Sequence, residues 1–148
     1  MDEDAFRAAR AELSPVPCMF EKALLSRCAD CAQAERRNIA EREAVACRSI
    51  IAQTQCGELR GLLRANSAFS LKMIADAPIP HAKDIKVQCG GLLGVQAQLG
   101  IQAGYPPIAN VYSIVAAAAN RYGSFESLPY GEIVQSVVAY EPRRRRTT

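Results

Sequence analysis

The sequence predicts an all-α protein: a compact, single-domain helical bundle of about five to six helices, with a cysteine-bearing N-terminal half. Three observations support this prediction. Apolar residues recur at helical spacing in several segments, prolines and glycines lie where those segments end, and no stretch of useful length alternates apolar with polar residues as a strand does. A length of 148 residues and an apolar content of 49% fit one folded domain, large enough to bury a core without needing disulfides to hold it together.

Prolines and arginines divide the chain into three parts. Residues 1–17 are expected to form a short charged N-terminal helix and a Pro-rich boundary, because Pro15 and Pro17 cannot continue a helix. Residues 18–142 are expected to form the single helical domain, since no repeat or linker divides them. Residues 143–148 form a basic tail.

Two helices are expected in the first half of this domain. Residues 32–46 are rich in Ala, Glu and Arg and contain neither Gly nor Pro, which favours a helix with a wide solvated face. Ser49 can cap the next helix, because its hydroxyl can accept a hydrogen bond from a free amide of the first turn. The inward face of that helix is marked by an apolar stripe: Ala52, Cys56, Leu59, Leu63 and, further on, Phe69.

Another stripe of apolar residues at helical spacing runs from Ala82 to Leu99. It includes Cys89, which is therefore expected to be buried. Gly90 and Gly94 on the same segment indicate that another helix approaches closely, because glycine weakens a helix unless such an approach compensates for it.

Two more helices complete the predicted bundle. Residues 108–121 are strongly apolar, and Gly123 is expected to end their helix. The last helix is expected to begin at Pro129, a residue suited to a first turn, and to bury Ile133, Val134 and Val137.

Four cysteines form the most informative pattern, Cys28-x2-Cys31-x15-Cys47-x8-Cys56. A two-residue gap lets two thiolates face a single centre, and the other two can complete a set of four ligands. A helix over 32–46 would separate Cys31 from Cys47 by about 22 Å, so a shared site requires the chain to fold back, with Asn38 as the expected interruption. Because zinc sites usually contain two Cys-x2-Cys pairs, an iron–sulfur cluster is the first expectation and zinc the alternative.

Other roles for these cysteines stay open. Cys18 and Cys89 are lower-ranked ligands, either of which can replace Cys56, and His81 is a further lower-ranked candidate. Cys56 and Cys89 also fit a purely structural role as buried core residues, because reduced cysteine packs as a small apolar side chain. A thiol–disulfide role for Cys28 and Cys31 is less favoured, because no strand precedes them as in the familiar redox motif.

Charge and composition restrict the partners. The formal charge of +3 comes from Arg143 to Arg146, so the body is nearly neutral and nucleic-acid binding is not expected, although this run can contact an acidic partner. The acidic N-terminus differs from a signal peptide, and no apolar stretch reaches the ~20 residues of a transmembrane helix. A cytoplasmic location with reduced thiols is therefore expected.

These features predict a small soluble protein that binds a metal or an iron–sulfur cluster through Cys28, Cys31, Cys47 and Cys56. Its expected role is electron transfer, or an accessory role in a larger redox assembly with a protein partner. The alternative is a helical protein–protein interaction module with structural zinc or no metal. Independent catalytic activity is not expected, because neither a nucleophile motif nor a phosphate-binding loop accompanies the single histidine.

Overall fold

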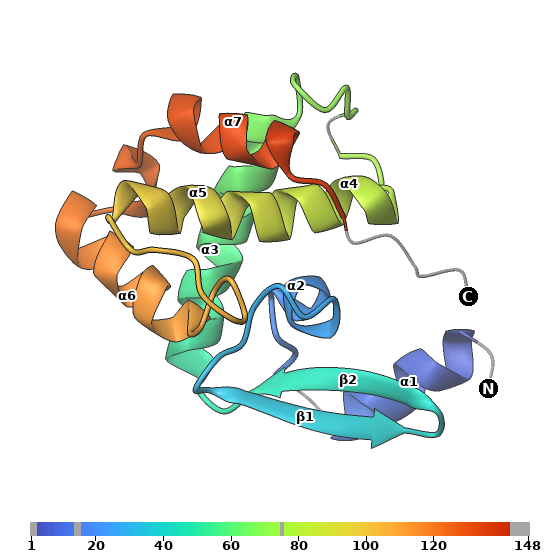
Figure 1. Ribbon diagram of the computed structural model, residues 1–148. Helices are drawn as coiled ribbons and strands as arrows, with labels where there is room; N and C mark the ends of the chain where they lie inside the picture. Colours follow the sequence, from blue (N-terminus) through green and yellow to red (C-terminus); the bar gives the residue numbers. More distant parts are fainter. Residues whose placement is uncertain (1–2, 14–15, 75, 143–148) are drawn as a thin grey trace.

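The computed structural model describes residues 3–13, 16–74 and 76–142. These form α1 (Glu3–Leu13), α2 (Glu21–Leu25), β1 (Ala34–Ile39), β2 (Arg42–Cys47), α3 (Ile50–Ser67), α4 (His81–Ile85), the π-helix η1 (Lys86–Gly90), α5 (Gly91–Gln98), α6 (Val111–Tyr122), the 3-10 helix η2 (Phe125–Ser127) and α7 (Tyr130–Ala139). The fold is mainly helical but includes a two-stranded antiparallel sheet, so the all-α prediction is wrong. Figure 1 shows this sheet and α1 at one end of the molecule, with α3 and α4 to α7 at the other and α2 between them.

The segment at 32–46, expected to be a helix, contains a β-hairpin instead. Ala34 pairs with Cys47 and Ile39 with Arg42, and the chain reverses at Ala40, whose φ is 55°. Intrinsic helix propensities differ by less than about 1 kcal/mol per residue between ordinary residues, so tertiary contacts can override them.

Contacts on every side of β2 explain the hairpin. Val45 is fully buried in the main core, whereas Ala44 belongs to a separate small cluster with Phe6 of α1 and Ile39. The backbone of Val45 is also satisfied from outside the hairpin: its N–H donates to the Glu21 carboxylate at 2.8 Å, and its carbonyl accepts from the N–H of Cys18 at 3.0 Å. A solvated helix would forgo this burial and these hydrogen bonds.

The predicted stripe from Ala82 to Leu99 is helical as α4, η1 and α5 in succession. Cys89 is fully buried, and the expected close approach is confirmed, with α7 as the neighbouring helix. A Cβ on Gly90 would lie 2.7 Å from Cα of Val137, and one on Gly94 would lie 3.0 Å from Cγ2 of Ile133.

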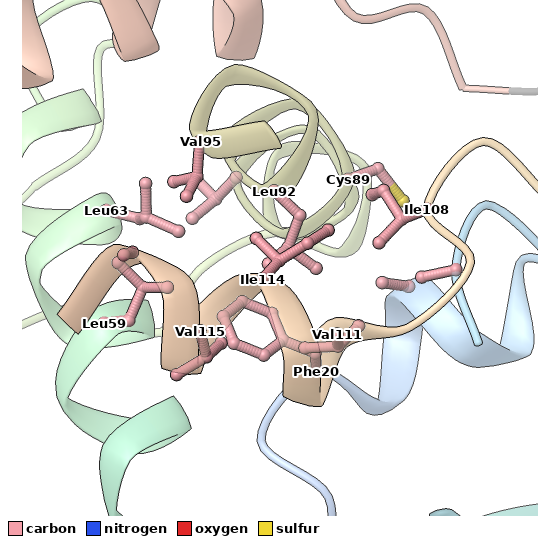
Figure 2. Packing of buried hydrophobic residues seen from close by; sticks show 14 of the residues in the cluster. Phe20, Leu59, Leu63, Cys89, Leu92, Val95, Ile108, Val111, Ile114 and Val115 are labelled. Atoms are coloured by element: carbon pink, nitrogen blue, oxygen red, sulfur yellow. The ribbon is translucent and has the colours of Figure 1, made fainter. Parts of the chain in front are cut away.

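The core joins α2, α3, α5, α6 and α7. Figure 2 shows part of it, with Leu59 and Leu63 of α3, Leu92 of α5 and Ile114 of α6 in one apolar cluster. Several predicted helix features are confirmed: Ser49 accepts a hydrogen bond from the N–H of Ala52 at 3.1 Å, Gly123 ends α6 with φ of 80°, and Ile133 and Val137 are fully buried. Val134, expected on the same buried stripe, is only half-buried.

Phe69 differs from its prediction, because α3 ends at Ser67 and the ring beyond it is 95% exposed. The basic tail at 143–148, which includes Arg143 to Arg146, lies outside the described residues. The expected contact of these arginines with an acidic partner therefore stays a prediction. None of the helices in the described ranges has the length and apolar character to span a membrane.

Candidate functional site

Four free thiols line one small cavity: Cys18, Cys31, Cys47 and Cys56. The cavity has a volume of about 20 Å³, which is room for a single water-sized group. Met19, Phe20, Ala34, Ala46, Ala52 and Val111 supply much of the remaining wall, and none of the described residues that line it is Lys, Arg or His. The four cysteines therefore lie around one mainly apolar space.

Each of the four cysteines comes from a different segment. Cys18 lies beside β2, where its N–H bonds to the carbonyl of Val45 and Pro17 forms an antiparallel bridge with Ala46. Cys31 precedes β1, and Cys47 is the last residue of β2. Cys56 lies in the second turn of α3.

The hairpin is what brings Cys31 and Cys47 together. A continuous helix would place them at opposite ends, whereas the reversal at Ala40 returns the chain so that Cys47 pairs with Ala34. The fold-back that a shared site requires is present, two residues beyond Asn38. The Cys47 thiol is held there by a hydrogen bond to the carbonyl of Ser49 at 3.1 Å.

Cys28 lies in a different place from Cys31. It forms a disulfide with Cys89 of η1, with a Cα–Cα distance of 6.3 Å. The chain at this point is extended, because Ala29 forms a parallel bridge with Ile108. Residues three apart in an extended chain face opposite sides, so Cys28 and Cys31 face different neighbours.

The predicted ligand set is thus divided. Cys31, Cys47 and Cys56 share the cavity with Cys18, which the sequence placed among the lower-ranked candidates, and Cys28 is paired with Cys89. The adjacent prolines favour extended backbone around Val16 to Cys18, a signal that this segment can pair with a strand. His81 is the exposed first residue of α4 and does not line the cavity.

Burial controls the charge of these thiols. It raises the pKa of Cys18 to about 12, an effect that the neighbouring Cys31 and Cys47 reinforce and the backbone N–H of Phe20 partly opposes. Burial likewise raises the pKa of Cys56 to about 12, with Cys18, Cys31 and Cys47 adding to the shift. Both thiols are protonated at neutral pH and are weak nucleophiles, because the thiolate is the reactive form.

Within the described ranges, no three His, Cys, Asp or Glu side chains are already arranged to hold a metal ion. The cavity is therefore lined by four free cysteines that do not yet form a finished ligand set. A change of one χ1 rotamer moves a cysteine sulfur by about 3 Å, which is enough to reorganise four thiols around a cavity of this size.

The chain matches no protein-family model, and no curated protein or solved structure matches it either. The class of protein is therefore defined by the fold and the cavity alone. It is a mainly helical protein whose β-hairpin completes, against α3, a four-thiol cavity lined by Cys18, Cys31, Cys47 and Cys56.

Proposed function

We propose that the protein binds a metal centre through Cys18, Cys31, Cys47 and Cys56. One observation carries this proposal: the four cysteines that are not in the disulfide all line one cavity, although they come from four separate segments. Single buried cysteines are common in protein cores, but core packing alone does not require all four cysteines to converge on one cavity.

The donor set defines the chemistry. Four thiolates select soft or borderline metals, which makes Zn²⁺ or iron the appropriate ion and disfavours Mg²⁺ or Ca²⁺. A bound cation also supplies the positive charge that the cavity wall lacks, so it can lower the raised pKa values of Cys18 and Cys56. Binding therefore releases protons, and the apparent affinity falls as the pH falls.

The size of the cavity favours one ion over a larger group. A volume of about 20 Å³ accommodates a single ion once the sulfurs have turned inward to about 2.3 Å from it. An iron–sulfur cluster would require the hairpin and α3 to move apart. Zinc is the expected occupant, and it would tie together the segment at Cys18, both ends of the hairpin and α3.

Metal analysis of untagged protein purified without oxygen tests the proposal. We expect one zinc per chain, and Cys18→Ser, Cys31→Ser, Cys47→Ser or Cys56→Ser should each lower the bound metal. If the protein instead contains iron and acid-labile sulfide, and the same four variants lose both, these cysteines are still the ligands. The bound group is then an iron–sulfur cluster with a role in electron transfer.

The matched control is the double variant Cys28→Ala/Cys89→Ala, which removes the other two cysteine sulfurs. It should keep the full amount of metal, whereas Cys18→Ser should not. Metal lost from the control but kept in Cys18→Ser would contradict this ligand set. A wild-type protein that takes up neither zinc nor iron, with all four thiols reduced, would end the proposal.

A further inference from the structure

The disulfide between Cys28 and Cys89 lies beside a second, larger pocket. This pocket has a volume of about 340 Å³ and is open to solvent, and its wall includes Ser26, Arg27, Cys28, Tyr105, Tyr140 and Glu141. Cys28 lines the pocket and is 5% exposed, whereas Cys89 is fully buried and is not part of the wall. Of the two cysteines in the bond, only Cys28 therefore borders the pocket.

We propose that this disulfide is a redox site that low-molecular-weight thiols open from the pocket, by attack on the sulfur of Cys28. The proposal goes beyond the metal centre, because it uses the two cysteines that do not line the four-thiol cavity. Both cysteines belong to the main core cluster, in which Cys89 packs with Leu92 and Ile108 (Figure 2), but only Cys28 borders the pocket.

The reaction balances as an exchange of thiols. The incoming thiolate forms a bond to Sγ of Cys28, the bond between Cys28 and Cys89 breaks, and its electron pair leaves on Sγ of Cys89, which then takes a proton from solvent. A second small thiolate attacks the sulfur of the bound small thiol, the bond from that sulfur to Cys28 breaks, and Cys28 leaves as a thiolate that takes a proton. Two small thiols are oxidised to one disulfide, and the protein gains two thiols.

Ser26 is placed to assist departure of Cys89. Its Oγ lies 3.5 Å from Sγ of Cys89 and 3.1 Å from the carbonyl of Ala23, to which it donates a hydrogen bond. When negative charge develops on Cys89, the same hydroxyl can turn and donate to the sulfur, which stabilises the leaving thiolate.

The pocket wall indicates the class of thiol. Arg27, whose guanidinium also contacts the Glu43 carboxylate at 3.4 Å, supplies a cation, Glu141 supplies an anion, and Tyr105 and Tyr140 supply aromatic rings. A zwitterionic peptide thiol carries a carboxylate and an ammonium group that complement this pair. The pocket volume is at the lower end of the range for small-molecule sites, which is enough for a thiol of tripeptide size.

The kinetics of reduction of the native wild-type protein by glutathione provide the first test. Quenching by alkylation, followed by peptide mass mapping, reports Cys28 and Cys89 separately. The rate should be first order in glutathione and unchanged by urea below the unfolding transition. A rate independent of glutathione, or one that rises steeply with urea, would show that the bond opens only by unfolding. Alkylation of both cysteines before any reductant is added would show that no disulfide forms.

A matched pair of variants then identifies the attacked sulfur. With oxidised glutathione, Cys89→Ser should form a stable mixed disulfide at Cys28 at least about tenfold faster than Cys28→Ser forms one at Cys89. Equal rates, or faster reaction at Cys89, would overturn the proposal. If either variant fails to fold, the kinetics of the wild-type protein still decide whether the native bond is attacked.

Discussion

Replacing Gly90 by alanine tests the packing of η1 against α7. The added Cβ would lie 2.7 Å from Cα of Val137 and 2.8 Å from the carbonyl oxygen of Ser136. Carbon atoms in contact normally lie about 3.5 to 4.0 Å apart, so the two helices must separate by about 1 Å. Both neighbours are backbone atoms, and no side-chain rotation can relieve the overlap.

The expected effect is the difference between two terms. Overpacking destabilises by about 1 to 3 kcal/mol, whereas alanine gains about 0.5 to 1 kcal/mol over glycine in a helix interior. Because the contact is with backbone, we expect Gly90→Ala to lower the free energy of unfolding by about 1 to 2 kcal/mol. Urea denaturation at fixed redox and metal state measures this difference as a lower midpoint with an unchanged m-value.

Gly61→Ala provides the matched control. Gly61 lies in the interior of α3, and apart from the backbone of the helix itself no atom lies within 4 Å of the Cβ that alanine would add there. Only the helix-propensity term remains, so this variant should be more stable than wild type by about 0.5 to 1 kcal/mol. The same sign of change in both variants, or a Gly90→Ala protein as stable as wild type, would refute the packing of η1 on α7.

Three further predictions concern other parts of the molecule. Ser49→Ala should lower the free energy of unfolding by about 1 kcal/mol in urea denaturation, because the first turn of α3 loses its side-chain cap. Asp84→Ala should cost about 1 to 3 kcal/mol, seen as a lower melting temperature, because the buried Gln88 amide loses its acceptor and Lys22 loses its partner at 2.9 Å. In metal-free protein, the pKa values of Cys18 and Cys56 are raised from 9.0 to about 12, so the fold favours their protonated forms. This stability is fully present below pH 9.0 and is lost as the pH rises toward about 12, by up to about 1.4 kcal/mol per pH unit for each thiol. Unfolding free energies that stay constant across this alkaline range would contradict the burial of the two thiols.

Much of the helical part of the fold follows from local sequence. The structure contains four features that local sequence predicts: the buried stripe around Cys89, the close helix approach at Gly90 and Gly94, the cap at Ser49 and the end of α6 at Gly123. These succeed because helix periodicity, capping and close approach depend on residues within a few turns of one another.

The hairpin depends on contacts that local sequence does not contain. Residues 32–46 have good helix formers and no breaker, and their strand form is stabilised by the burial of Val45 and by hydrogen bonds from Glu21 and the segment at Cys18. Because such contacts join residues more than 20 positions apart, neither propensity nor spacing within the segment can reveal them.

The sequence by itself determined the mainly helical core and the burial of Cys89, and it predicted that several of the cysteines share one site. Only the tertiary structure decided how those cysteines are divided, with Cys18 at the cavity and Cys28 bonded to Cys89. The physical reason lies in the backbone between the cysteines. An extended segment directs Cys28 and Cys31 to opposite sides, and a hairpin returns Cys47 to Cys31, so distance in space no longer follows spacing in sequence.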